Sequence, residues 1–329
     1  MPAKIIKHKW FLVCLVLAVF LAFFRNTQGT WQQDNYVGYA EHLPSDIGQI
    51  SFFDSRLLPG LPILIYILHY LAGDFYVAGY LITFLSFIGS YLLLYKLTKS
   101  NLSFLPLVFP PILLNLASLI DTEYPFIFLL ILGYSLIKGR RYNLAFLVIG
   151  ISVWFRLAGV AVMAGVFVYM LLKKEFRKVF AGLSYFLMPV LLLSLYNIHF
   201  FGYENPFYQL FAYQALHPER ISFGAIQLVQ DLIRAIRWGW YKIFISGFFY
   251  VIFYVLMYIK TFKTKGLEFW IITGLYLFTL SVNLVPFLEN LGRYLAPAVP
   301  FFWLVHYNKL QRSALAVAAI IASFLVVIV

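Results

Sequence analysis

A stretch soon after the first apolar run carries two carboxylates and an imidazole, Asp34, Glu41 and His42. If the stretch is helical, Asp34 and Glu41 are seven residues apart and share one face. A carboxylate that is held near a bilayer surface and partly desolvated can accept a proton from a sugar or lipid hydroxyl. A solvated polar loop is the simpler interpretation of the same residues.

Two further acids, Asp121 and Glu123, stand in a short segment between two apolar runs. A polar turn explains one such residue. Two acids in a short hairpin at a membrane face exceed what a turn requires, because charge near the bilayer interior is costly and usually marks a site.

Three arginines occupy comparable positions at the ends of apolar runs. Arg56 follows Asp54 and is suited either to binding a phosphate or to pairing with that acid. Arg156 and Arg293, the latter followed by Tyr294, are single cations in apolar surroundings. A guanidinium grips phosphate through its planar fork, whereas the ordinary alternative is that the side chain extends to the lipid headgroups.

The composition shows which elements must position these side chains. The chain has 329 residues, of which 63% are hydrophobic, 20% aromatic and only 12% charged. A water-soluble domain carries roughly 25% charged residues. The composition therefore excludes a soluble enzyme, a disordered regulator and a nucleic-acid-binding module, and it predicts an all-α integral membrane protein.

Eleven apolar runs are candidate crossings, since a crossing needs about 20 mostly apolar residues. Phe23, Phe24 and Arg25 offer no signal-peptide cleavage site, so we expect the first run to be retained. The eleven runs are Trp10–Phe24, Phe75–Leu97, Leu102–Leu119, Tyr124–Ile137, Tyr142–Phe155, Ala158–Leu172, Val179–Phe201, Tyr241–Ile259, Leu267–Leu288, Leu295–Val305 and Ser313–Val329.

A twelfth run, Leu57–Ala72, decides the topology. If it does not cross, 17 of the 25 Lys and Arg residues lie on one side together with only two acids, Glu175 and Glu268. Because Lys and Arg are retained in short cytoplasmic loops, that side is predicted to be cytoplasmic. Pro59 and Pro62 also disfavour a full-length helix. The net charge of +12 is then explained by topology, and no nucleic-acid partner is needed.

The expected organisation is one polytopic domain over residues 1–329, with a cytoplasmic N-terminus and external segments at 25–74 and 202–240. The first segment contains the non-spanning helix. The second contains an amphipathic stretch at 224–242, with Ile226, Val229, Ile233, Ile236 and Trp240 on one helical face. That pattern fits a helix in the membrane interface, and a loop helix packed on the bundle fits it equally.

Motifs of soluble enzymes, such as a P-loop or G-x-S-x-G, are absent, and the single Cys14 excludes both an intrachain disulfide and a multi-cysteine zinc site. Taken together and in order, however, the polar sets resemble the polytopic GT-C glycosyltransferases, particularly the GPI-type mannosyltransferases and the dolichyl-phosphate-mannose and lipid A aminoarabinose transferases. The resemblance rests on Trp31…Asp34-Asn35-Tyr36, Arg56-Leu57-Leu58-Pro59, Asp121-Thr122-Glu123-Tyr124-Pro125, Arg156-Leu157-Ala158-Gly159 and Arg293-Tyr294-Leu295-Ala296-Pro297.

The resemblance implies inverting transfer of a sugar from a polyprenyl-phosphate donor to a hydroxyl of a lipid, glycan or protein acceptor on the external or luminal face. Asp34 would be the general base. Arg293 with Tyr294, Arg56 and Arg156 would bind the phosphate. Asp121 and Glu123, with Glu41 and His42, would orient the acceptor or hold a divalent cation such as Mg²⁺ or Mn²⁺; no cofactor is certain.

Two other classes of protein remain open. A transporter for lipids or sugars would use similar intramembrane charges, but it commonly has paired repeats or broken helices at the midplane. A polymerase or ligase of lipid-linked glycans would favour a long external loop with arginine and histidine, as at His217–Arg220.

Overall fold

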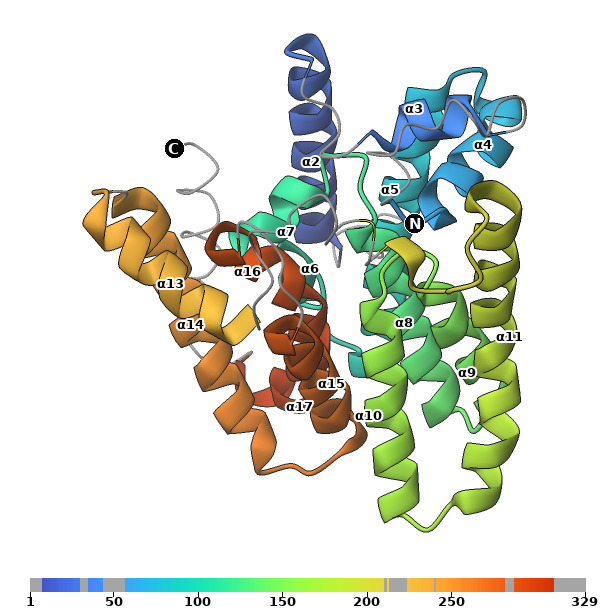
Figure 1. The fold of residues 1–329 in the computed structure, drawn as a ribbon. Helices are drawn as coiled ribbons and strands as arrows, with labels where there is room; N and C mark the ends of the chain where they lie inside the picture. The colour runs from blue at the N-terminus through green and yellow to red at the C-terminus, as the bar shows by residue number, and fades with distance from the viewer. Residues whose placement is uncertain are drawn as a thin grey trace.

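The computed structural model describes residues 8–29, 35–43, 57–209, 212, 224–239, 241–281 and 287–310, and within these ranges the regular elements are helices (Figure 1). The all-α class predicted from composition is therefore confirmed. In chain order the helices are α2 (Lys9–Thr27), α3 (Tyr36–Glu41), α4 (Gly60–Ala72), α5 (Phe75–Thr98), α6 (Leu105–Val108), α7 (Pro111–Leu116), α8 (Glu123–Lys138), α9 (Tyr142–Ser152), α10 (Ala158–Leu172), α11 (Phe176–Phe201), α13 (Gly224–Arg237), α14 (Tyr241–Phe262), α15 (Leu267–Ser281), α16 (Phe287–Leu295), the 3-10 turn η4 (Ala296–Ala298) and α17 (Val299–Leu310).

By length and composition, three of the described helices are long and apolar enough to cross a membrane. These are α2, α5 and α11, with 19, 24 and 26 residues. Other apolar helices are shorter, among them α9, α10 and α15. The expected number of eleven crossings is therefore not confirmed, and its last run, at 313–329, lies outside the described residues.

The run Leu102–Leu119 is not one helix. It is divided into α6, with four residues, and α7, with six. Prolines at 106, 110 and 111 explain the division, because proline lacks the amide hydrogen that a helix interior needs and forces the preceding residue out of the helical region. At 1.5 Å per residue, neither piece approaches the ~30 Å of a hydrocarbon core.

Helix α4 lies in the run Leu57–Ala72, which the sequence predicts not to cross the membrane. It has 13 residues, about 20 Å at the α-helical rise. Its first amide, at Gly60, donates to the carbonyl oxygen of Trp154 at 2.9 Å. A Cβ at Gly60 would lie 2.6 Å from that oxygen, so only glycine allows α4 to dock this closely on the turn after α9.

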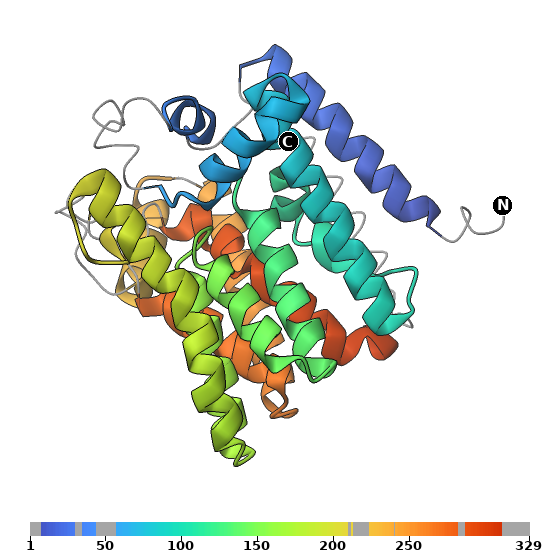
Figure 2. The same ribbon diagram turned by 90° about the vertical axis from the view of Figure 1, so that its right-hand side faces the viewer.

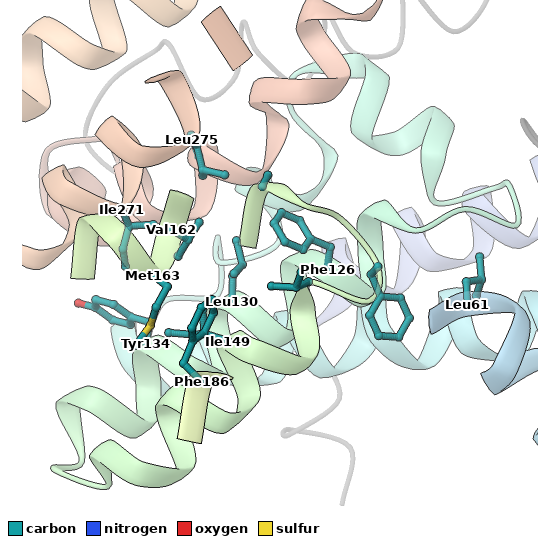
Figure 3. Packing of buried hydrophobic residues seen from close by; sticks show 14 of the residues in the cluster. Leu61, Phe126, Leu130, Tyr134, Ile149, Val162, Met163, Phe186, Ile271 and Leu275 are labelled. Carbon is teal, nitrogen blue, oxygen red and sulfur yellow. The ribbon is translucent and has the colours of Figure 1, made fainter. Parts of the chain in front are cut away.

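The core of the bundle lies between helices that are far apart in the sequence. Figure 3 shows Leu130, Ile149, Val162 and Leu275 packed together from α8, α9, α10 and α15. Helices α10 and α15 cross closely, since a Cβ at Gly165 would lie 2.1 Å from the carbonyl oxygen of Trp270. Small residues at such crossings let membrane helices approach each other.

The helices give the bundle two distinct ends. We call one the basic end; it contains the turns with Lys99, Arg140, Lys174 and Lys265, which follow α5, α8, α10 and α14. The α10–α11 and α14–α15 turns lie together at the bottom of Figure 1, whereas α3, α4 and α16 lie toward the top. Figure 2 shows α5 running alongside the same bundle.

Candidate active site

The amino terminus of α8 carries two buried carboxylates at the end of the bundle opposite the basic end. Asp121 is 1% exposed and Glu123, the first residue of α8, is fully buried. The amide of Thr122 donates to Asp121 Oδ1 at 2.6 Å. Acidic side chains are favoured at this position because the helix dipole is positive at its amino terminus.

Arg293 lies on α16 and meets both acids. Its Nη2 donates to Asp121 Oδ1 at 2.9 Å and to Glu123 Oε2 at 3.3 Å, and its Nε donates to Glu123 Oε1. Helix α16 is also held by α14, since the hydroxyl of Tyr254 on α14 donates to the carbonyl oxygen of Gly292 at 2.8 Å. The fork of the guanidinium is therefore held in one orientation.

Arg156 approaches Glu123 from the turn between α9 and α10. Its Nη1 donates to Glu123 Oε1, so a single carboxylate accepts from two arginines that are 137 residues apart in the sequence. The guanidinium of Arg156 also lies over the ring of Tyr294, 5.4 Å from its centroid, within the range of a cation–π contact. Tyr294 thus belongs to the same cluster.

We call these five residues, Asp121, Glu123, Arg156, Arg293 and Tyr294, the arginine cluster. Its two acids and two guanidinium groups balance in charge. Burial of isolated charges in a low-dielectric interior is costly, and paired, hydrogen-bonded charges are the tolerated form. A guanidinium has five N–H donors, and the bonds above use Nε and Nη2 of Arg293 and Nη1 of Arg156. Within the described residues the other N–H groups of both guanidinium groups make no hydrogen bond, so they are available to an anionic ligand.

Helix α3 lies beside the arginine cluster. Tyr36, its first residue, is buried and close enough to Arg293 for an electrostatic interaction. Asn35 caps the helix, since its Oδ1 accepts from the amide of Gly38 at 3.2 Å. Asp34, the expected base, directly precedes this cap but lies outside the described residues, as do Arg56 and His217–Arg220.

Glu41 and His42 do not join the arginine cluster. Both are exposed at the far end of α3. The Nδ1 atom of His42 is 2.6 Å from the carbonyl oxygen of Gly38, which places this ring at the carboxyl end of the helix. Their expected part in acceptor or metal orientation has no support from this position.

The acids of the cluster are also poorly suited to a divalent cation. No group of three His, Cys, Asp or Glu side chains comes together in the part of the chain that the structure describes. Asp121 and Glu123 already face two guanidinium groups, whose charge disfavours a second cation. We therefore derive no step through a metal ion.

Helix α13 confirms the amphipathic pattern expected from Gly224 onward, and it ends at Arg237. Ile226, Val229, Ile233 and Ile236 are 50–59% exposed. Part of the polar face turns inward, since Gln227 is buried and its Nε2 donates to Asp231 Oδ1 at 2.7 Å, whereas Arg234 and Arg237 are exposed. Trp240 lies outside the described residues.

A second buried polar group was not identified from the sequence. Asn197, in the last turns of α11, is fully buried; its Oδ1 accepts from Gln209 Nε2 at 2.7 Å, and its Nδ2 donates to the carbonyl oxygen of Asn205 at 2.8 Å. At the preceding residue of α11, the Tyr196 hydroxyl lies 2.7 Å from the Tyr39 hydroxyl and joins α11 to α3. The sequence signal for this group is the amide side chain of Asn197 inside the otherwise apolar run Val179–Phe201.

Comparisons with known proteins found a similarity of fold but no match in sequence. No family model matches the sequence, and no curated protein matches it. Among solved structures, the fold is similar to that of ArnT from Cupriavidus metallidurans bound to undecaprenyl phosphate, with a TM-score of 0.58 and 15% sequence identity over 93% of this chain. The chain spans 61% of the length of ArnT. The protein therefore has an ArnT-like membrane fold, and the resemblance to the polytopic GT-C glycosyltransferases expected from its sequence is confirmed at the level of the fold.

Proposed function

We propose that this protein is a membrane glycosyltransferase that moves a sugar from a polyprenyl-phosphate donor to a hydroxyl of a lipid, glycan or protein acceptor. The observation that carries the proposal is the arginine cluster, buried at one end of a bundle whose fold is similar to that of an undecaprenyl-phosphate-binding protein. A donor that resides in the membrane needs no soluble nucleotide-binding domain, in agreement with the composition.

The proposed reaction is a single displacement with inversion. Asp34 takes the proton of the acceptor hydroxyl while the acceptor oxygen attacks the anomeric carbon of the donor. The bond between that carbon and the phosphate oxygen breaks, and its electron pair leaves with the polyprenyl phosphate. In the sequence, Asp34 directly precedes Asn35, the cap of α3, and Tyr36 of that helix interacts with Arg293. This closeness of α3 to Arg293 supports a site in which the base and the phosphate ligands act on the same donor.

Arg293 and Arg156 are the proposed phosphate ligands, together with Arg56. Charge that develops on the leaving phosphate is stabilised best by donors that are already oriented. Glu123 and Asp121 hold Arg293 through three hydrogen bonds, and Tyr294 supports Arg156 from one side. We therefore assign the two acids to positioning the arginines rather than to binding an acceptor.

The proposed site faces the external or luminal side of the membrane, and the N-terminus is cytoplasmic. The distribution of lysine and arginine supports this orientation, because the turns at 96–99, 138–141, 173–178 and 260–265 all belong to the basic end. The arginine cluster lies at the other end.

The experiment that tests the proposal uses the full chain reconstituted in vesicles with a panel of undecaprenyl-phosphate-linked sugars and a membrane extract as acceptor. Mass spectrometry measures free undecaprenyl phosphate and the sugar that is transferred. Asp34→Asn is expected to abolish both products. Arg293→Lys keeps the charge but loses the fork, so it is expected to raise the KM for the donor about tenfold or more and to leave the KM for the acceptor unchanged.

The matched control is Glu204→Gln, which removes an exposed acid beyond the carboxyl end of α11, in the external segment at 202–240. It is expected to retain full turnover. Normal turnover by Asp34→Asn would reject the assignment of the base. Movement of the intact donor between leaflets without release of undecaprenyl phosphate would instead identify a transporter and overturn the proposal.

A further inference from the structure

Four turn residues at the basic end have an unusual backbone conformation. Lys99, Arg140, Lys174 and Lys265 have φ angles of 56°, 60°, 59° and 47°. A Cβ atom is strained in this left-handed region. Glycine adopts it freely and is the usual residue just after a helix. At each of these four positions the chain carries a cation instead.

The opposite end of the bundle follows the usual rule. The left-handed residues described there are Gly29, Gly73, Gly202 and Gly239. At this end of the bundle, each described left-handed position is therefore occupied by glycine, which adopts the conformation without strain. At the basic end each left-handed position is occupied by a cation, in spite of the conformational cost of its Cβ atom.

A pocket of about 220 Å³ opens between three of these turns, those that follow α8, α10 and α14. It is several times larger than the ~30 Å³ that a water molecule occupies in the liquid. Its polar lining comes from the ends of α8, α9 and α10 and from the residue before α11, and consists of Lys138, Arg140, Tyr142, Tyr169, Lys173 and Glu175.

Two of the cations in this lining have no acidic partner in the part of the chain that the structure describes. Lys138 pairs with Glu268 at 3.1 Å, and Glu175 pairs with Lys178 at 2.8 Å, which neutralises the acid in the pocket. Arg140 and Lys173 form no ion pair within the described residues. The pocket thus has an excess of positive charge.

Two further features add positive charge around the pocket. The phenol rings of Tyr142 and Tyr169 hold lysine ammonium groups 4.3 and 5.9 Å from their centroids. Helix α9 begins at Tyr142, and the side chain of Arg141 does not cap it. Its amino terminus therefore adds a partial positive charge next to the fork of Arg140.

We propose that this pocket binds the phosphate group of an anionic molecule, with the headgroup of an anionic phospholipid as the expected source. The lipid is favoured over a soluble phosphate because apolar side chains stand exposed beside the pocket. Leu144, Leu172 and Phe176 are 50%, 64% and 51% exposed, and they offer a surface for acyl chains. Basic pockets between membrane helices are suited to such headgroups.

Native mass spectrometry of the full chain in neutral detergent tests the proposal, with phosphatidylglycerol and phosphatidylcholine as the added lipids. Arg140→Gly removes the charge and relieves the left-handed strain, so the variant is expected to fold at least as well. Its affinity for phosphatidylglycerol is expected to fall about fivefold, as for the loss of one cation near a headgroup, with no change for phosphatidylcholine. The matched control is Lys99→Gly, a left-handed cation outside the pocket, which is expected to retain binding.

Glycerol 3-phosphate and inorganic phosphate form the soluble arms of the experiment. Binding of either one to the unaltered chain and its loss in Arg140→Gly would support a phosphate site that is filled from water. Equal loss of phosphatidylglycerol in Arg140→Gly and Lys99→Gly would overturn the proposal in favour of a general surface charge. Failure of both lipid and soluble arms to respond to Arg140→Gly would overturn it as well.

Discussion

The two ends of the bundle use the same kinds of charged residue in opposite ways. At the arginine cluster, few charges are present, and they are buried and paired: Glu123 is fully buried and meets two guanidinium groups. At the basic end, charges are many and exposed, as in the pair of Lys178 with Glu175, whose side chains are 41% and 33% exposed. The difference teaches that burial, rather than residue type, decides whether a charged side chain must be paired and hydrogen-bonded.

The largest expected effect is an all-or-none difference in labelling between the two ends. Cysteine introduced at Asp74, between α4 and α5, is expected to react with a membrane-impermeant maleimide added to intact cells. Cysteine at Lys263, in the turn after α14, is expected to react only after permeabilisation. Both positions are exposed, and the positive-inside rule gives the orientation.

The native chain is the control for this labelling, because its single Cys14 is buried. The reverse result, with position 263 labelled from outside and position 74 protected, would invert the orientation. Protection of position 74 in intact cells would also mean that the run Leu57–Ala72 crosses the membrane.

A large effect on stability is expected at the arginine cluster. Glu123→Gln leaves Arg156 without its acid partner and Arg293 with only Asp121, so the free energy of unfolding is expected to fall by about 3–5 kcal/mol, as for a broken buried ion pair. Glu175→Gln breaks an exposed pair at the basic end and is expected to cost less than about 1 kcal/mol. Thermal unfolding in detergent measures both.

The double variant Glu123→Gln with Arg156→Gln sharpens this comparison. Removal of the stranded guanidinium is expected to restore part of the lost stability, so the two substitutions should not be additive. Equal losses of unfolding free energy in Glu123→Gln and Glu175→Gln would show that the buried ion pair contributes no more to stability than the exposed one.

The smallest effect is expected from an exchange of the left-handed turn residues. Gly202→Lys introduces a Cβ at a φ of 72°, where no atom lies within 4 Å, so only backbone strain acts, and a loss of about 1 kcal/mol is expected. Lys174→Gly relieves the same strain at the basic end. A gain of no more than about 1 kcal/mol is expected there, because glycine also increases the entropy of the unfolded chain.

Thermal unfolding in a neutral detergent checks this pair of variants, since an anionic lipid bound at the basic end would add its own stabilisation. A loss of stability in Lys174→Gly under these conditions would contradict the strain argument. It would mean that contacts of the lysine side chain outweigh the conformational cost.

The sequence was sufficient to predict the helical class, a short helix at α4 and the amphipathic α13, because hydrophobic periodicity and the effect of proline act locally. That α4 does not cross the membrane stays a prediction. The sequence also identified every member of the arginine cluster as a separate candidate. The pairing of Arg293 with Asp121 could not be predicted from the sequence, since 172 residues separate them. Either residue was also compatible with a solvated or headgroup-facing position.

Other features escaped prediction for physical reasons. Hydropathy averages over Leu102–Leu119 and does not register that prolines break the backbone into α6 and α7. Residue type does not reveal φ, so the left-handed conformation of Lys99 or Arg140 left no trace in the sequence. The roles of Asp34 and Arg56 remain predictions, because both lie outside the described residues.

The balanced charge of the arginine cluster has a consequence for turnover under the proposed reaction. Arg156 and Arg293 already have counterions in Glu123 and Asp121. The buried charges are therefore neutralised without a bound substrate. An arriving phosphate must share the guanidinium groups with these resident acids, which limits how tightly it is held. Once the sugar has departed, the same acids compete with the spent carrier lipid and favour its release.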